Sequence, residues 1–413
     1  MTVEEGRVDC CIVGCGPAGA ILGLILARAG IDVTVLEKHQ DFFRDFRGDA
    51  IHPPTLGVLE ELGLIDRYFE LPLQRDLAIK IVTNEGVLPL ADFANPKAKY
   101  PYVTYVPQWD FLNLLTDEAK RYPNFRLLMQ AEGVDLLTSE GAIRGVRYQT
   151  PDGLRELTAT LTVAADGRRS RMRTCAGLVP KDFGAAMDLL WFRVSRVATD
   201  PKETFVRLVP GYVFAMVQRD TYWQVGYVVP KGTYQKLRAH DVGALRTILR
   251  HALPFLGSRV DELQSWDLVG FLEVQVNRLT KWHRAGFLCL GDAAHASSPV
   301  AGFGVNMAVH DAVAAANAVA GPLLRGRVTK RDLARVKRRR QLPTILTQAV
   351  QRLVQRDIVE VPDLLDPQRL AALPSTLNLE NEVHLPLPVV TRIFRRLTGR
   401  VITAGLRSEH IRV

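Results

Sequence analysis

The chain has 413 residues, of which 47% are hydrophobic and 23% charged, as in an ordinary soluble globular protein with one large or two smaller domains. Its formal net charge is +9, but Arg325–Arg340 alone holds nine Lys or Arg residues and one acid, so the remainder is close to neutral. This basic segment contains no aromatic residue, which argues against nucleic-acid binding. We interpret it as a solvated helix face, with attraction of an anionic ligand or of a membrane surface as alternatives.

The first residues, MTVEEGRVD, are acidic and polar, unlike a signal peptide. No apolar run reaches membrane-spanning length, because Arg28 interrupts one candidate and His310 and Asp311 interrupt the other. The five cysteines form no pair of CxxC units, which argues against a metal site and favours reduced core thiols. We therefore expect a cytoplasmic protein without a transmembrane segment.

A strand, a glycine-rich turn and a helix open the chain. Val8–Val13 is typical of a buried parallel strand, Gly14–Gly19 (GCGPAG) follows at once, and an apolar helix is predicted over Pro17–Ala29. In such a unit the glycines allow a tight turn, a close approach of a pyrophosphate and close helix packing. A second strand, Asp32–Leu36, leads to Glu37, whose carboxylate can bind ribose hydroxyls and would repel a 2′-phosphate. This unit predicts a dinucleotide site that disfavours NADP.

The middle of the chain alternates between helical and strand-like patterns. A helix is predicted to begin near Pro54, strands between Leu77 and Val106, and a helix in residues 107–124. Strand formers then dominate residues 182–277 and predict a second sheet. The last ninety or so residues are expected to be helical.

Two further motifs follow predicted strands. ADGRRSRMR (residues 165–173) comes directly after a strand-like run, where backbone amides and arginines can neutralise phosphate oxygens. GDAAHASSPVAGFGVN (residues 291–306) follows the strand Phe287–Leu290, and a helix begins near Gly304. Backbone amides and the dipole at the start of that helix would stabilise negative charge.

In this order the three motifs resemble the FAD site of the flavoprotein aromatic hydroxylases, the group A FAD-dependent monooxygenases related to p-hydroxybenzoate hydroxylase. The resemblance implies an α/β fold in which a Rossmann-like FAD-binding domain carries an inserted β-sheet substrate domain and C-terminal helices. The expected FAD-binding domain comprises residues 1–75, 107–181 and 278–325. The expected substrate domain comprises residues 76–106 and 182–277, and the C-terminal helical region residues 326–413.

The resemblance also implies which residues bind FAD. Asp292 would bind the ribityl hydroxyls, and Arg47 would reach the phosphates, with Arg44 as a weaker candidate for that role. The loop from Pro299 would pass close to the isoalloxazine ring. The full expected set is Gly14, Gly16, Pro17, Ala18, Gly19, Glu37, Lys38, Arg47, Gln108, Asp166, Gly167, Asp292, Pro299, Gly302, Gly304, Val305 and Asn306.

The implied reaction is hydroxylation of a small phenolic or polycyclic aromatic substrate with NAD(P)H and O2, through a flavin C4a-hydroperoxide. The sequence has no second strand–GxGxxG–helix unit, so NADH or NADPH is expected to bind transiently, and the basic segment is one place it could dock. No acid or base can be assigned. His52, Tyr212, Tyr222 and His295 are candidate pocket residues, although a packing role is favoured for each. The aromatic strand segment Tyr212–Tyr227 could line an apolar substrate pocket, but we favour its interpretation as part of the core.

Other functions share the same scaffold. A flavin halogenase would carry a WxWxIP element, which YWQVGYVVP (residues 222–230) lacks. A reductase or hydroxylase of a lipophilic quinone or isoprenoid is an alternative, because residues 389–401 form a basic amphipathic pattern suited to peripheral membrane contact. A flavin-binding protein without turnover is the non-enzyme alternative. A monomer and a homodimer are equally compatible with the sequence.

Overall fold

The computed structural model describes residues 3–43, 50–84, 86–93, 99–209, 211–359 and 408–413. Its first sheet has strands in the order β19-β20-β11-β1-β2-β8, with β10 and β9 continuing from β11. The five strands β20, β11, β1, β2 and β8 are parallel to one another. The bounds are β1 Val3–Val13, β2 Val33–Leu36, β8 Phe125–Leu128, β9 Glu132–Ser139, β10 Ala142–Thr150, β11 Gly153–Ala164, β19 His283–Arg284 and β20 Phe287–Cys289.

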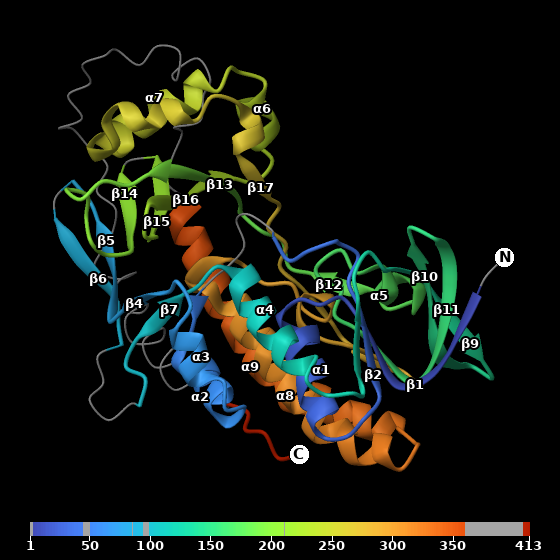
Figure 1. Cartoon of the computed structure of the whole chain (residues 1–413). Coiled ribbons are helices and arrows are strands. Elements are labelled where there is room, and N and C mark those ends of the chain that lie inside the picture. The colour runs from blue at the N-terminus through green and yellow to red at the C-terminus, as the bar shows by residue number, and fades with distance from the viewer. Residues whose placement is uncertain (1–2, 44–49, 85, 94–98, 210, 360–407) are drawn as a thin grey trace.

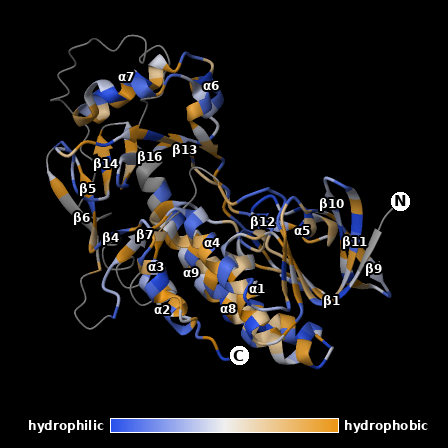
Figure 2. Cartoon of the chain, in the orientation of Figure 1, coloured by the Kyte–Doolittle hydropathy of each residue, from blue (hydrophilic) through white to orange (hydrophobic). Residues whose placement is uncertain are grey.

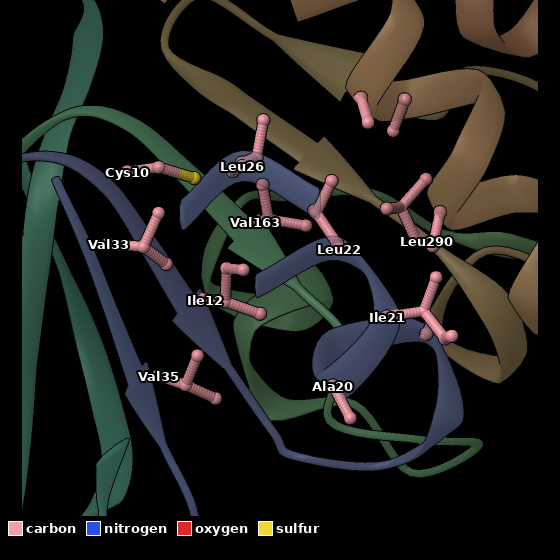
Figure 3. Close-up of a cluster of buried hydrophobic side chains, with 14 of the residues drawn as sticks. Cys10, Ile12, Ala20, Ile21, Leu22, Leu26, Val33, Val35, Val163 and Leu290 are labelled. Atoms are coloured by element: carbon pink, nitrogen blue, oxygen red, sulfur yellow. The ribbon is translucent and has the colours of Figure 1, made fainter. Parts of the chain in front are cut away.

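Helices α1 (Pro17–Arg28) and α8 (Phe303–Leu324) lie against each other beside this sheet. Figure 3 shows side chains of β1 and β2, including Ile12 and Val35, gathered with those of α1 in one buried cluster. Strands covered on both faces need apolar residues at successive positions, which explains the unbroken apolar run that leads into the glycine turn. Residues 300–324 are long and apolar enough to cross a membrane, yet 78% of the most apolar window is buried inside the protein. This helix is a core helix of the fold.

A second sheet has the order β17-β13-β16-β15-β14-β5-β6. Its strands are mostly hydrophobic (Figure 2), and they come from two separate parts of the chain. The expected α/β fold with an inserted sheet is therefore confirmed, whereas the exact domain limits stay a prediction. The bounds are β5 Ala78–Val82, β6 Val87–Asp92, β13 Met187–Ser195, β14 Phe205–Val209, β15 Tyr212–Gln218, β16 Tyr222–Pro230 and β17 Gly270–Leu272.

The two faces of the second sheet have different neighbours. Helices α6 (Tyr234–Arg238) and α7 (Gly243–Ala252) and the turns of η1 (Pro254–Glu262) pack on one face, which we call the outer face. The other, the inner face, looks toward the body that contains α8 and α4 (Gln108–Ala119), as Figure 1 shows. Residues of the outer face include Leu190, Phe192, Phe205, Tyr212, Phe214, Trp223, Val225 and Tyr227.

The aromatic residues of β15 and β16 therefore fill the outer core. Tyr212, Phe214, Trp223 and Tyr227 are each at most 4% exposed. The interpretation of this strand pair as a pocket wall is wrong for these four side chains, and the packing alternative is confirmed. Tyr222 is half-buried, with the Arg193 guanidinium 4.8 Å from its ring centre.

Smaller elements complete the described part of the chain. A three-stranded sheet has the order β3-β7-β4, and β12 pairs with β18. Strands β4 and β7 lie below the second sheet in the view of Figure 1. The bounds are β3 Ala50–Ile51, β4 Gln74–Asp76, β7 Val103–Tyr105, β12 Pro180–Asp182, β18 Asn277–Leu279, α2 Pro53–Glu61, α3 Ile65–Phe69, α5 Arg171–Cys175, η2 Trp266–Leu268, η3 Gly291–Ala293, η4 Val300–Gly302 and α9 Lys330–Val359.

Candidate functional site

The carboxyl ends of four parallel strands meet at one edge of the first sheet. Val13, at the end of β1, is paired with Leu36 of β2 on one side and with Ala164 of β11 on the other. Ala164 is in turn paired with Cys289 at the end of β20. The first two sequence motifs start directly after Val13 and Ala164, and the third starts two residues after Cys289, so segments more than a hundred residues apart lie side by side. Ligands of parallel α/β sheets bind at this edge.

The glycine turn after β1 has no room for side chains at two positions. A Cβ at Gly14 would lie 2.5 Å from the carbonyl oxygen of Ala165, and one at Gly19 would lie 2.0 Å from that of Gly14. A Cβ at Gly16 would meet nothing within 4 Å, so open space lies beside the start of α1. Gly16 is also the N-cap of α1 and provides no side-chain cap. Free helix amides beside open space fit the pyrophosphate of a dinucleotide.

The Glu37 carboxylate is held at the rim of this turn. Its Oε2 accepts a hydrogen bond from the amide of Cys15 at 3.0 Å, and its Oε1 accepts one from the amide of His39 at 3.2 Å. Each carboxylate oxygen keeps a second lone pair, which suits the expected contact with ribose hydroxyls. Lys38 is exposed, and Gln108 is half-buried at the first position of α4. Their contacts with FAD stay predictions.

Asp166 acts within the protein at the start of α5. Its carboxylate accepts hydrogen bonds from the Ser170 hydroxyl at 2.5 Å and from the Met172 amide at 3.0 Å. Burial raises the pKa of Asp166, although both hydrogen bonds oppose the shift. Arg173, expected to neutralise phosphate, is instead buried and donates to the carbonyl oxygens of Ala293 and Arg168 at 3.1 and 3.0 Å. This arginine joins the second motif to the third.

Asp292 follows β20 at the same edge of the sheet. Its carboxylate lies 3.3 Å from the guanidinium of Arg168, and both side chains are a little over a quarter exposed. A carboxylate that is reachable from solvent at a strand end suits a polyol such as the ribityl chain. Arg168 was not anticipated as its partner, because the two residues lie in different motifs.

The loop from Pro299 to Gly304 has an unusual backbone. Ala301 and Gly302 both adopt left-handed conformations, with φ of 58° and 64°. A Cβ at Gly302 would lie 2.6 Å from the Cβ of Ala50. A non-glycine residue in this conformation costs on the order of 1 kcal/mol and persists where its surroundings fix it.

Two side chains fix that loop. His52 donates from Nε2 to the carbonyl oxygen of Ala301 at 3.0 Å, and its ring meets the Phe303 ring edge-on at 5.1 Å. Asn306 accepts from the His52 amide and the Thr55 hydroxyl, both at 2.8 Å. The Asn306 amide group also donates at 2.9 Å to the carbonyl oxygens of Ala50 and Gly302. The Asn306 side chain is thus used in holding the loop, and any contact with FAD would come from its backbone.

A buried charge cluster supports the same region from behind. Asp311 of α8 accepts from the Gly291 amide at 3.2 Å, and lies 2.6 Å from His295 Nε2 and 2.9 Å from Arg340 Nε. Burial raises the pKa of Asp311, but His295 and Arg340 outweigh it, so the pKa falls below its usual range. Glu409, near the C-terminus, lies 3.8 Å from Arg340.

This cluster corrects one sequence interpretation. Arg340 is 2% exposed, so the solvated helix face expected for the basic segment does not extend to it, while Arg331, Arg335 and Arg338 are exposed. The four positions named for the pocket are placed by their contacts. His52 and His295 support the loop and the turn after β20, Tyr212 lies in the outer core, and Tyr222 is half-buried beside Arg193. Arg44, Arg47 and the amphipathic segment 389–401 lie outside the described residues.

Comparison with known proteins agrees with this geometry. A family model described as an FAD binding domain matches residues 7–352. The 6-methylpretetramide 4-monooxygenase of Streptomyces rimosus is 30% identical over 345 residues, which cover 83% of this chain and 82% of that protein. The para-nitrophenol 4-monooxygenase of Pseudomonas sp. (strain WBC-3) is 26% identical over 329 residues, covering 77% and 79% of the two chains.

Solved structures share the fold. The p-nitrophenol 4-monooxygenase PnpA of Pseudomonas putida DLL-E4 superimposes with a TM-score of 0.76 at 20% identity, covering 99% of this chain and 100% of that one. PqsL of P. aeruginosa in complex with 2-aminobenzoylacetate gives a TM-score of 0.75, covering 89% and 99%. The chain belongs to the group A FAD-dependent aromatic hydroxylases and is an FAD-dependent monooxygenase.

Proposed function

We propose that this monooxygenase hydroxylates a phenolic ring of a polycyclic aromatic substrate, with NAD(P)H and O2 as co-substrates. One observation supports the proposal most directly. The four strand ends of the first sheet and the largely apolar inner face of the second sheet lie on either side of the loop Pro299–Gly304. Val217 of the inner face packs with Phe303 at the start of α8, so sheet and loop are in contact at one end. The substrate would lie farther along the inner face, beside the isoalloxazine ring of FAD.

Each part of the chain would have a separate task. FAD, when bound, would accept reducing equivalents from NAD(P)H and activate O2 for transfer of one oxygen atom to an electron-rich ring. The start of α8 would stabilise negative charge on the reduced cofactor through its amides and dipole. His52 and Asn306 would keep the loop in place during turnover. The apolar inner face would exclude water and orient the ring to be hydroxylated.

The test is a turnover assay on the purified chain reconstituted with FAD. NAD(P)H consumption should rise on addition of 6-methylpretetramide, the compound named for the S. rimosus relative, and the product should gain one oxygen atom. Comparison of NADH with NADPH identifies the reductant, and gel filtration of the same sample distinguishes monomer from homodimer. Failure to bind FAD, or NAD(P)H consumption that no aromatic compound stimulates, would contradict the proposal.

A second candidate is reduction of a lipophilic isoprenoid. Digeranylgeranylglycerophospholipid reductase 1 of Methanopyrus kandleri is 26% identical over 319 residues, covering 73% of this chain and 77% of that protein. The product mass separates the two reactions, because a reductase adds two hydrogens and a hydroxylase adds one oxygen. We favour hydroxylation, because the 6-methylpretetramide relative is more similar and covers more of the chain.

A further inference from the structure

Trp191 of β13 occupies a gap made by two glycines on the second sheet. Its paired neighbours are Gly226 on β16 and Gly270 on β17. A Cβ at Gly226 would lie 2.8 to 3.2 Å from three atoms of the Trp191 indole, so the indole rests close against this glycine. Ala215, the next residue in this cross-strand row, is also small. The row therefore places one large aromatic side chain beside three small residues.

The indole is on the inner face of the sheet. Its chain neighbours Leu190 and Phe192 belong to the outer core, and successive residues of a strand point to opposite faces. Two residues along β13, Arg193 lies with its guanidinium 5.8 Å from the ring centre of Trp109 on α4. The inner face around Trp191 thus faces the body that carries the glycine turn after β1, Asp292 and the loop Pro299–Gly304, which together we call the FAD cradle.

The indole N–H of Trp191 has no acceptor among the described residues, although the side chain is only 8% exposed. Trp223 and Trp282 do have one: Trp223 Nε1 donates to Asp200 at 2.9 Å, and Trp282 Nε1 donates to the carbonyl oxygen of Leu279 at 3.1 Å. A buried donor without a partner costs about 1–3 kcal/mol, so native proteins normally supply an acceptor. A bound molecule that displaces the surrounding side chains would supply it here, because the nitrogen itself is buried.

The surroundings of Trp191 define what that molecule can be. Along β13 the inner-face neighbours of Trp191 are the apolar Leu189 and the charged Arg193, which is paired with Gln224. Farther across the sheet the inner-face positions Val206, Ala215 and Val228 are apolar and half-buried. This surface would accept a flat ring system, with the indole N–H as a hydrogen-bond donor on its apolar side and Arg193 at one edge.

On the basis of the proposed hydroxylase function, we infer that Trp191 is a substrate-positioning residue. Its ring packs against a planar polycyclic substrate, and its Nε1 donates a hydrogen bond to a carbonyl or phenolic oxygen of that substrate. Gly226 is required because a side chain there would displace the indole. We therefore expect the protein to bind polycyclic phenols more tightly than single-ring phenols, because a larger ring system makes more contact with the indole and with the small residues beside it.

The test compares Trp191→Phe with Trp223→Phe in the FAD-loaded protein. Both changes remove one indole N–H from the second sheet, but Trp223 lies on the outer face and its N–H is satisfied by Asp200. The readout is the Kd of 6-methylpretetramide and of p-nitrophenol, measured by the change in flavin absorbance on titration. Trp191→Phe should weaken polycyclic binding about 3- to 10-fold, the range for one hydrogen bond, while Trp223→Phe lowers Tm and leaves Kd unchanged.

Gly226→Ala is the second test variant, because the added Cβ should displace the indole. It should weaken polycyclic binding at least as much as Trp191→Phe does. The inference is overturned if Trp191→Phe and Gly226→Ala leave the polycyclic Kd within twofold of the wild-type value. It is also overturned if the wild-type protein binds p-nitrophenol as tightly as 6-methylpretetramide. Because the titration needs no turnover, a protein that binds but never hydroxylates would contradict only the proposed function.

Discussion

The FAD cradle and the inner face of the second sheet are built by opposite means. In the cradle, the backbone makes the site: Gly14 and Gly19 are required because carbonyl oxygens occupy the space of their side chains. On the inner face, side-chain size makes the site: the small residues Gly226 and Ala215 follow Trp191 in one cross-strand row. The first arrangement suits a ligand shared by a whole family, and the second can change one residue at a time to suit a particular substrate.

The largest effect is expected from a pair of glycine changes in the cradle. Gly19→Ala places a Cβ 2.0 Å from the Gly14 carbonyl oxygen, so the protein should lose more than about 3 kcal/mol of stability or fail to fold. Gly16→Ala meets nothing within 4 Å and should cost at most about 1 kcal/mol without FAD, yet weaken FAD binding at least about tenfold. Urea unfolding of the apoprotein and FAD titration separate the two. Unchanged FAD affinity in Gly16→Ala would show that the open space beside α1 is not the pyrophosphate site.

The two faces of the second sheet should respond to mutation in opposite ways. Phe214→Ala empties a fully buried outer position and should cost about 3–5 kcal/mol, with KM for the aromatic substrate unchanged. Ala215→Leu, one residue along β15, fills the inner face and should raise KM at least about tenfold while stability changes by under about 1 kcal/mol. Thermal unfolding and steady-state kinetics of both variants measure the contrast. If Ala215→Leu leaves KM unchanged, the substrate does not lie on this face.

Asp292→Asn should act on the cofactor with little effect on the fold. The Asp292–Arg168 pair is partly exposed, so its loss should cost no more than about 1 kcal/mol. Removal of the carboxylate should nevertheless raise the Kd for FAD about tenfold, because hydrogen bonds to charged groups contribute roughly 1.5–3 kcal/mol. Arg168→Gln is the control: it breaks the same pair and keeps the carboxylate. If both variants lose FAD equally, the ion pair and not Asp292 itself holds the site.

Much of the cradle could be predicted from the sequence because each motif is local. A strand, a glycine turn and a helix occupy about thirty consecutive residues, and parallel pairing then brings the ends of different strands to one edge without further information. The support of the Pro299–Gly304 loop could not be predicted in this way. Asn306 and His52 are 254 positions apart in the sequence. The motif that contains Asn306 suggested a cofactor ligand, whereas its side chain holds the loop in place.

The inner face was missed for a different reason. Alternation along a strand shows which residues share a face, but it does not show which face meets helices and which meets a ligand. The aromatic residues Tyr212 to Tyr227 were therefore considered for the pocket, while Trp191 on a neighbouring strand was overlooked. The pairing of Trp191 with two glycines depends on strand register, which only the assembled sheet provides.

The smallest expected effect concerns pH and the cradle loop. Burial lowers the pKa of His52 to about 4, although its hydrogen bond to Ala301 opposes the shift. Because the folded pKa is below the ordinary value of about 6.5, the neutral form stabilises the protein above pH 6.5, and this stability is lost as pH falls toward 4. At pH 5.5 the loss should be about 1.4 kcal/mol, one pH unit below the unfolded pKa. FAD retention should fall with it, since His52 holds the Ala301 carbonyl.

The matched variant for this pH effect is His52→Gln. Glutamine keeps a donor for the Ala301 carbonyl but does not titrate, so the pH dependence of unfolding between pH 7.5 and 5.5 should become shallower by about 1.4 kcal/mol. Burial also lowers the pKa of His310, to about 3, and this residue leaves a similar dependence in the variant. Identical slopes for wild type and His52→Gln would mean that His52 is not buried as a neutral ring, and that the left-handed backbone at Ala301 is fixed by Asn306 and the packing of Phe303 instead.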